Sequence, residues 1–401
     1  MYVTMQMRQK LLLALWQVQD DGRGQEFRKH GETGSAEEKE KAGGRKRKAE
    51  SSLDASKGSL QCAGERKQDR LMHPKNIYSV QQPDFGKLAE LYPSLRQYLV
   101  KQCRSGSKET QDEEMKCIID FANPNACREL VKAQLHHDFK ISWDLPSQYL
   151  IPPLANRLNY LCWLHDLFQL WTPERDDFDW GRENDCVKVL DIGCGANLIY
   201  PLLGSSYFRW CFVAADVSSD ALQHAIRNRE ANPKIAPLIV LRRVKCQTCQ
   251  ETKQVASDRH ERAFSGCGTG ILSRAINNTD GVFHASMCNP PFFSSKEEAG
   301  RNPGTDYGGT SVEMVYPGGE ESFVRNMIQD SRSIRHRIVW FTTMVGKKST
   351  LKMARKMIHD FGQTVVRTTE FIQGKTSRWA IAWSFLAPNQ VSQKPLVRTW
   401  T

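Results

Sequence analysis

The chain is 401 residues long, with 40% hydrophobic residues, 25% charged residues and a formal net charge of +11. This length allows one large domain or two ordinary ones with a sizeable core. The excess of positive charge favours a polyanionic partner over a small neutral one, and a basic soluble protein without such a partner is the alternative.

The N-terminal sequence contains one short apolar run, residues 11–16. It is too short to span a membrane, and no cleavage site of small residues follows it. The twelve cysteines are scattered without regular spacing, which predicts reduced thiols in the cytosol or the nucleus. We therefore expect a soluble, intracellular protein.

Residues 1–71 are predicted to be a disordered basic and polar extension. Much of this segment is rich in Lys, Glu, Gly, Ser and Gln, so it buries too little apolar surface to offset the entropy of ordering. The basic cluster at 45–48 is a nuclear import signal, a nucleic-acid contact or a solvated run of charge. The sequence changes character at Met72, where we expect the functional module to begin.

Residues 72–150 predict a small, mainly helical N-terminal module. The expected elements are helices over 85–91 and 94–100, an amphipathic helix over 126–139 and a short strand over 140–143. Asp84 and Ser94 are suitable N-caps for the first two helices. An apolar helix over 157–171 and an acidic, turn-rich linker then lead into the next strand.

A second domain over 151–388 is predicted to handle a nucleotide. A buried strand over 187–191 is followed by Gly193 and Gly195 and by a helix that starts near Ala196. A dinucleotide fingerprint requires a small residue at position 198, where this chain has Leu. The pattern beginning at Asp191 suits S-adenosylmethionine better, although tight strand–helix turns use paired glycines in any case.

The next strand, over 210–215, ends at Asp216, 25 residues after Asp191. This is about where a ribose-binding acid lies in a βαβ unit. An acid that caps the following helix, expected over 220–230, is the alternative. A third strand is expected over 238–242.

The fourth strand ends at the sequence Asn289-Pro290-Pro291-Phe292. Two prolines remove backbone donors and fix φ, so the Asn289 amide oxygen and the Pro290 carbonyl are presented rigidly as acceptors. That arrangement suits the amino group of a flipped base whose ring stacks on Phe292. A rigid turn at a strand end is the alternative. The glycine pair, the strand-end acid and this motif, in this order on successive strands, together favour an amino-directed methyltransferase.

The remaining sequence continues the alternation of strand and helix. We expect a polar loop over 294–319, helices over 322–331 and 352–361, strands over 338–342, 364–368 and 380–385, and a tail over 389–401. The last two strands lie too close together for a helical crossover and should pair antiparallel. The expected fold is therefore α/β, with a mostly parallel seven-stranded sheet and an antiparallel last strand.

Several motifs together resemble the methyltransferase-like 16 family. They are Met-His-x-x-Asn-x-Tyr at 72–78, Pro-Asp-Phe at 83–85, Arg-Leu-Asn-Tyr at 157–160, Asp-Ile-Gly-x-Gly-Ala from 191, Ile-Tyr-Pro-Leu-Leu-Gly at 199–204, Cys-Asn-Pro-Pro-Phe-Phe at 288–293, Gly-Lys-Lys at 346–348 and Arg-Trp-Ala-x-Ala-Trp-Ser-Phe at 378–385. The resemblance implies a Rossmann-like class I methyltransferase that modifies adenosine N6 in U6 small nuclear RNA. It also implies a nuclear enzyme that uses S-adenosylmethionine, with a related bacterial enzyme that acts on ribosomal RNA.

The resemblance also implies roles for particular residues. The cofactor would contact Arg157, Asp191, Gly193, Gly195, Asp216 and Asn289. It would also contact a threonine that maps to Thr248, with Thr269 as the alternative. The adenine would contact Asn289, Pro290, Pro291 and Phe292. Residues 249–270 look like an insertion, and Gln247 replaces an expected Lys, which puts the family's autoregulatory loop in doubt. Large family members also carry a C-terminal RNA-binding region, which we expect this chain to lack.

Basic and aromatic residues outside these motifs are candidates for RNA contacts. They are His73, Lys75, Tyr78, Lys347, Lys348, Lys375 and Arg378. For the first three residues, the alternative is an arm that packs on the next domain. For the other four, the alternative is a solvated basic face. A zinc site at Cys246, Cys249, His260 and Cys267 is disfavoured because no second cysteine pair exists, so no metal is expected, and the sequence gives no sign of an obligate protein partner.

Two other classes of function fit the same motifs. An enzyme with another target, such as ribosomal RNA, DNA adenine or protein glutamine, is the first. The second is an RNA-binding protein that keeps the cofactor fold without catalysis. The intact Asp191, Gly193, Asp216 and Asn289 argue against that reading. We expect structured RNA as the substrate and a location in the nucleus, with the cytoplasm as a further possibility.

Overall fold

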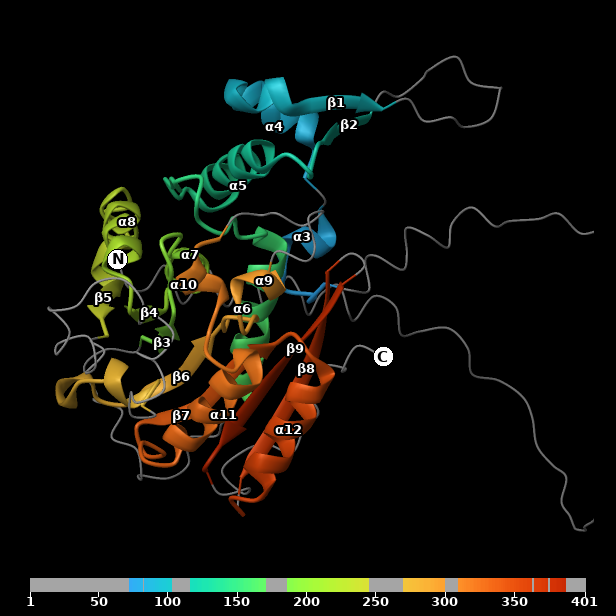
Figure 1. Cartoon of the computed structure of the whole chain (residues 1–401). Coiled ribbons are helices and arrows are strands. Elements are labelled where there is room, and N and C mark those ends of the chain that lie inside the picture. Colours follow the sequence, from blue (N-terminus) through green and yellow to red (C-terminus); the bar gives the residue numbers. More distant parts are fainter. Residues whose placement is uncertain are drawn as a thin grey trace, which may run out of the picture. The chain divides into compact units, whose positions relative to one another are not determined.

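A computed structural model describes residues 72–81, 83–102, 116–170, 186–244, 270–299, 309–362, 364–373 and 376–386 (Figure 1). The predicted extension 1–71, the tail 389–401, the linker 173–185, the cysteine and histidine cluster, Thr248 and Lys375 lie outside these residues. Within the described residues, no helix is both long and apolar enough to cross a membrane.

A seven-stranded sheet forms the centre of the fold, in the order β5-β4-β3-β6-β7-β9-β8. The strands are β3 (Lys188–Ile192), β4 (Cys211–Asp216), β5 (Ile239–Arg243), β6 (Phe283–Cys288), β7 (Ile338–Val345), β8 (Val365–Gln373) and β9 (Thr376–Ser384). The first five are parallel, and β9 is antiparallel to both of its neighbours. The mostly parallel sheet with an antiparallel last strand is therefore confirmed.

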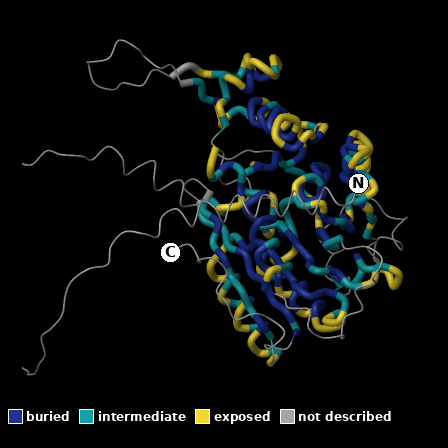
Figure 2. Tube along the Cα trace, turned by 180° about the vertical axis from the view of Figure 1, so that it is seen from behind, coloured by how far each residue is buried: buried dark blue, intermediate teal, exposed yellow. Residues whose placement is uncertain are grey.

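Helices cover both faces of this sheet. They are α6 (Leu154–Gln169), α7 (Ile199–Tyr207) and α8 (Ser219–Glu230) on one face, and α11 (Gly319–Ser331) and α12 (Lys348–His359) on the other. The alternation of side chains along β7 shows the two layers, because Trp340 packs with the first group of helices and Phe341 with the second. Figure 2 shows buried residues along the strands and exposed residues on the outer helix turns.

The contact between α7 and β4 depends on a glycine. A Cβ atom at Gly204 would lie 2.4 Å from Cζ and 2.5 Å from Cε2 of Phe212, whose side chain is buried. No rotamer change of a core Phe ring relieves such an overlap without displacing the helix from the sheet.

We predict that Gly204→Ala lowers the free energy of unfolding by about 2 kcal/mol, measured by urea denaturation. The matched control is Gly86→Ala in a shorter helix, where the nearest atom to a new Cβ is an Asp84 oxygen at 3.3 Å. There the better helix propensity of alanine should leave stability equal or slightly higher. Equal midpoints for Gly204→Ala and wild type would contradict this account of the packing.

The N-terminal part contains a small core of its own. Its elements are α3 (Ile77–Val80), α4 (Phe85–Leu91), the 3-10 helix η2 (Pro93–Tyr98), the antiparallel pair β1 (Leu99–Gln102) and β2 (Lys116–Ile119), and α5 (Pro124–Phe139). Leu88, Leu95 and Ile119 pack against one face of α5, while Val131 and Leu135 on that helix join the main core. Asp84 caps α4 as predicted, since its side chain accepts a hydrogen bond from the Lys87 amide.

Two predicted elements in this part are wrong. The second helix is a 3-10 turn that ends at Tyr98, and the chain then becomes extended to pair with a strand distant in sequence. Residues 140–143 form no strand, although they are extended in part. The backbone here is bonded by asparagine side chains in and just after α8 instead: the Ser142 amide donates to Asn232 Oδ1 at 2.9 Å, and the amide of the following Asp144 donates to Asn228 Oδ1 at 2.9 Å.

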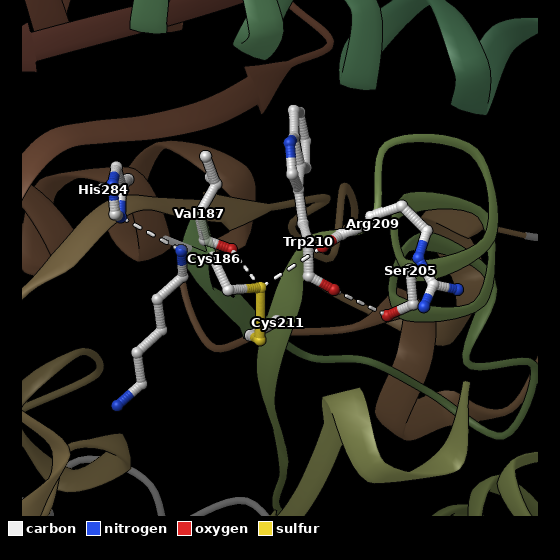
Figure 3. The surroundings of a disulfide bond; sticks show 8 residues. Cys186, Val187, Ser205, Arg209, Trp210, Cys211 and His284 are labelled. Atoms are coloured by element: carbon white, nitrogen blue, oxygen red, sulfur yellow. Dashed lines mark hydrogen bonds between the residues drawn. A yellow bond between two sulfur atoms is a disulfide. The ribbon is translucent and has the colours of Figure 1, made fainter. Parts of the chain in front are cut away.

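A disulfide joins Cys186 to Cys211, with Cα atoms 6.1 Å apart (Figure 3). These residues lie at the amino ends of β3 and β4, where the Lys188 amide also donates to His284 Nδ1. The expectation that all cysteines are reduced is therefore wrong for this pair. The disulfide can form because the parallel register of the neighbouring strands β3 and β4 brings together two cysteines that are 25 residues apart.

The remaining described elements are short. They are α9 (Lys296–Ala299) and α10 (Ser311–Met314), within the segment predicted as a polar loop, and the 3-10 turns η3 (Ala236–Leu238), η5 (Ser273–Ala275) and η6 (Asn278–Asp280). Phe293 forms a parallel β-bridge with Val315, so the two ends of that polar segment are held together.

Candidate active site at the carboxyl ends of the parallel strands

Four neighbouring strands end at the same edge of the sheet. Because β4, β3, β6 and β7 are adjacent and parallel, the residues after each strand meet at one edge, where open α/β sheets bind their ligands. Ile192 pairs with both Ala215 and Cys288. This register places the glycine turn after β3 between Asp216 and Asn289.

The glycine turn depends on left-handed backbone conformations. Gly193 has φ +74° and Gly195 has φ +62°, values that favour glycine. A Cβ at Gly193 would have no heavy atom within 4 Å, so the space beside this residue is open. Leu198 is also left-handed at φ 50°, and α7 therefore begins at Ile199 rather than at Ala196 as predicted.

Asp216 serves the glycine turn rather than the helix that follows it. Its Oδ2 accepts a hydrogen bond from the Gly195 amide at 2.9 Å, and its Oδ1 accepts from the Ser218 amide at 2.9 Å. The N-cap of α8 is Ser218, whose hydroxyl accepts from the Ala221 amide. The helix-cap alternative for Asp216 is therefore wrong. Burial raises the pKa of this carboxyl, while the amide hydrogen bonds from Ser218 and Gly195 oppose the rise.

Two charged side chains beside the turn have unfilled hydrogen-bonding capacity. Asp191 is buried, and its Oδ2 has no hydrogen-bond partner among the described residues. Arg157, on α6, donates from Nη1 to the Tyr200 hydroxyl at 3.0 Å, but its buried Nε has no partner in the described part of the chain. Buried polar atoms are rarely left unpaired in native proteins. This pair therefore suits a ligand that carries both donors and acceptors.

The environment of Asp191 makes it titrate far from its usual range. Burial, with a smaller contribution from the negative charge of Asp216, raises the pKa of Asp191 to about 8, and the positive charge of Arg157 opposes the rise. The folded carboxyl therefore holds a proton at pH values where the unfolded chain has lost it. Its contribution to stability is fully present below about pH 4 and is lost as pH rises through 8.

We predict that Asp191→Asn makes the free energy of unfolding less dependent on pH. Between pH 5 and pH 8 the wild type should lose up to about 4 kcal/mol relative to the variant, as measured by urea unfolding of the ligand-free protein. Asp220→Asn, on the exposed first turn of α8, is the control and should follow the wild type. Parallel pH profiles for wild type and Asp191→Asn would refute the buried-proton account.

The Asn289 turn is held from both sides. Cys288 and Pro290 are buried, and the amide of Phe293 donates to the Met314 carbonyl at 3.0 Å. The Oδ1 atom of Asn289 is buried without a hydrogen-bond partner among the described residues. An amide oxygen held in this way at the carboxyl end of β6 is a preorganised acceptor.

Phe292 forms a wall beside this acceptor. The guanidinium carbon of Arg378, on β9, lies 5.4 Å from the centre of the Phe292 ring. A Cβ at Gly346, just after β7, would lie 3.0 Å from Phe292 Cδ1, so the ring rests against the backbone there. The two residues come from strands that sequence spacing does not connect with the Asn289 turn.

Glu313 is a site residue that the sequence analysis missed. With Thr310 it forms a capping box at the start of α10, and its Oε2 also accepts a hydrogen bond from the Leu150 amide at 3.4 Å. Its Oε1 lies 3.6 Å from the position of a Cβ at Gly195. The sequence signal was the pattern Thr-x-x-Glu, which marks a helix start within the predicted loop.

The first three RNA-binding candidates are engaged within the protein. His73 Nε2 lies 2.9 Å from Asp166 Oδ2, and Lys75 donates to Asp166 Oδ1 at 2.7 Å. Tyr78 is 4% exposed, and its hydroxyl donates to Asp138 at 2.8 Å. These contacts favour the alternative of an arm that packs on the next domain.

Of the other described candidates, Arg378 lies over the Phe292 ring. Lys347 pairs with Glu298 at 3.1 Å, and Lys348 lies over the Trp379 ring at 5.4 Å. Arg378 is therefore the described candidate with a direct contact to the Asn289 turn. Among the described residues, no cluster of three His, Cys, Asp or Glu side chains is arranged to hold a metal ion.

Comparison with known proteins gives one family. Residues 66–387 match the model of a family of RNA methyltransferases. The RNA N(6)-adenosine-methyltransferase mettl16 of Danio rerio is 32% identical over 336 residues, covering 82% of this chain and 62% of the relative. Ribosomal RNA large subunit methyltransferase F of Flavobacterium johnsoniae is 32% identical over 343 residues, covering 80% of this chain and 95% of the relative. The chain therefore spans less than two thirds of the animal relative but nearly the whole bacterial one.

Solved structures give the same result. The catalytic domain of hMettl16, in complex with MAT2A 3′UTR hairpin 6, matches with a TM-score of 0.60 and 31% identity, covering 79% of this chain and 98% of that chain. The N-terminal domain of human METTL16 in complex with SAH matches with a TM-score of 0.57 and 30% identity, covering 79% of this chain and 99% of that chain. The mixed sheet and its flanking helices are thus those of this group of structures.

Proposed function

The chain belongs to the family of RNA methyltransferases that includes METTL16 and ribosomal RNA large subunit methyltransferase F, and we propose that it methylates adenosine N6 in structured RNA. The observation that carries the proposal is the buried, unpaired Oδ1 of Asn289 at the carboxyl end of β6. This oxygen lies next to the glycine turn, so the same edge of the sheet can hold both the cofactor and the adenine.

The residues of the glycine turn fit S-adenosylmethionine. The buried Nε of Arg157 and Oδ2 of Asp191 offer a donor and an acceptor to its amino-acid end, the open space at Gly193 allows close approach, and Asp216 suits the ribose hydroxyls. This cofactor supplies an electrophilic methyl group on a sulfonium sulfur. A complex of human METTL16 with SAH supports this assignment.

The Asn289 turn fits an adenine amino group. In the proposed complex the N6 hydrogens donate to Asn289 Oδ1 and to the Pro290 carbonyl, while the ring stacks on Phe292. These contacts hold the base with its amino nitrogen facing the glycine turn, so most of the rate enhancement comes from positioning and exclusion of water. The amino proton leaves after the new bond forms, so the proposal requires no residue as a general base.

U6 small nuclear RNA, with mRNA hairpins as further targets, is the proposed substrate. The motifs shared with the methyltransferase-like 16 family support U6, and the MAT2A 3′UTR hairpin in the complex of hMettl16 supports mRNA hairpins. A nuclear location is part of the same proposal. Ribosomal RNA is the second candidate, because the chain covers 95% of a bacterial ribosomal RNA methyltransferase and only 62% of the animal relative.

The test is transfer from labelled S-adenosylmethionine to three RNAs: a U6 hairpin, an mRNA hairpin and a large-subunit ribosomal RNA fragment. Nucleosides from the digested products are identified by mass spectrometry. We expect N6-methyladenosine in the U6 hairpin. Modification of the ribosomal fragment alone would replace the proposed substrate, and cofactor binding without transfer to any RNA would favour another acceptor or a non-catalytic protein.

A further inference from the structure

Glu320 is a buried acid whose bonds hold a turn of the candidate site. It lies in the first turn of α11 and is 2% exposed. Its Oε2 accepts a hydrogen bond from the Gly346 amide at 2.7 Å, and its Oε1 accepts from the Lys347 amide at 3.3 Å. Both donors belong to the turn that leaves β7. The carboxylate thus joins the start of a helix to the end of a strand.

That turn is in direct contact with Phe292. A Cβ at Gly346 would lie 2.7 Å from Glu320 Oε2, 3.0 Å from Phe292 Cδ1 and 3.2 Å from Phe292 Cε1. Only a glycine fits between the carboxylate and the ring without a shift of one of them. The position of the Gly346 backbone therefore sets how closely the Phe292 ring approaches the sheet.

The same helix start also contacts the chain on the far side of Phe292. A Cβ at Gly319 would lie 3.4 Å from the Ser294 amide nitrogen, two residues beyond the ring. Gly318 and Gly319 have φ values of +76° and +68°, which let the helix begin this close to the turn. The first residues of α11 thus touch both the Asn289 turn and the turn after β7.

A charge relation completes the group. Arg378 lies over the Phe292 ring, and burial lowers its pKa while the negative charge of Glu320 opposes that change. Glu320 therefore acts on Phe292 through its hydrogen bonds to the turn after β7, and its negative charge also favours the Arg378 cation over the ring. An acid needed only to favour the helix dipole requires neither of these contacts, and Glu321 in the same turn has none of them, since it pairs with Arg325.

We propose that Glu320 is a positioning residue for Phe292: it holds the Gly346 turn so that the ring is set as the stacking surface for the target base. The inference rests on the proposed function, because it assigns the base to Phe292. It adds a residue from α11, outside the sequence motifs, to those that determine the geometry of the acceptor site.

The test compares Glu320→Ala and Glu320→Gln with Glu321→Ala, which removes the same charge from the same helix turn at an exposed position. The full chain is used, and thermal melting gives the folded fraction of each variant. For Glu320→Ala we expect kcat for RNA to fall about 30-fold or more, with the Kd for S-adenosylhomocysteine within about twofold of wild type. Glu320→Gln keeps an acceptor oxygen for the turn and should recover part of the loss.

A second readout does not require methyl transfer. The Kd for an RNA hairpin with adenosine at the target position is compared with the Kd for the same hairpin with an abasic site there, and the ratio of the two reports how much the flipped base contributes to binding. Wild type and Glu321→Ala should show the same ratio, and Glu320→Ala should show a smaller loss of affinity for the abasic hairpin. The inference is overturned by equal ratios in Glu320→Ala and wild type, by no preference of wild type for the adenosine hairpin, or by a kcat loss that matches the loss of folded protein. Ratios as predicted without transfer by wild type would sink the proposed function alone.

Discussion

Replacing Asn289 by alanine should reduce kcat for methyl transfer by about 10³-fold, because it removes a preorganised acceptor for the amino group at the point of reaction. In this structure the Asn289 oxygen is already buried and unpaired among the described residues, so its desolvation cost is met before substrate binds. The measurement is single-turnover transfer to whichever RNA the wild type modifies, with saturating cofactor.

The matched control for Asn289→Ala is Asn278→Ala, on the exposed turn η6 at the opposite edge of the sheet. It should retain full activity. Asn289→Asp keeps an oxygen acceptor but loses the amide nitrogen and adds a charge. Its kcat should therefore lie between the kcat of Asn289→Ala and that of Asn278→Ala. A kcat for Asn289→Ala within tenfold of wild type would mean that this turn is only a rigid strand end.

Replacing Asp216 by alanine should weaken cofactor binding by about 100-fold, equivalent to about 3 kcal/mol. The change leaves the Gly195 and Ser218 amides without their acceptor and removes the carboxylate proposed to bind the ribose hydroxyls. Titration calorimetry with S-adenosylhomocysteine measures this loss directly. Because the cofactor binds before any chemistry, the prediction is independent of the RNA target.

The control for this variant is Asp220→Ala, which removes an acid from the exposed first turn of the same strand–helix unit. Its Kd should stay within threefold of wild type. An equally small change for Asp216→Ala would show that the carboxylate only shapes the turn. In that case the loss should appear as a lower melting temperature of the ligand-free protein instead.

The central sheet was predictable because its strands are short, continuous apolar runs that end at polar motifs. The run before Asn289 and the one before Asp216 each give a strand with the predicted end, since both faces are buried. The antiparallel last strand followed from connection length alone. The residues of the glycine and Asn289 turns could be selected because their chemistry is local to one strand end.

The contacts between distant segments were not predictable. The β1–β2 pair depends on a partner strand separated by residues with no apolar pattern, and the stretch near Ser142 depends on asparagine side chains in and just after α8. Glu313 and Glu320 read as ordinary helix-start acids, and only packing shows that one lies by Gly195 and the other by Gly346. Local patterns carry no information about which element a side chain will meet.

The place of β9 in the sheet affects the order in which the site can form during synthesis. This strand is the last of the described strands in sequence, yet it lies between β7 and β8 (Figure 1). Until β9 has left the ribosome, the edge of β7 is unpaired and β8 has no partner strand in the described sheet. An unpaired strand edge of this kind tends to pair with other chains. Arg378 also arrives only with β9. A nascent chain that already contains the Asn289 turn is therefore expected to lack a finished acceptor site, and competence should appear only when the final hairpin closes.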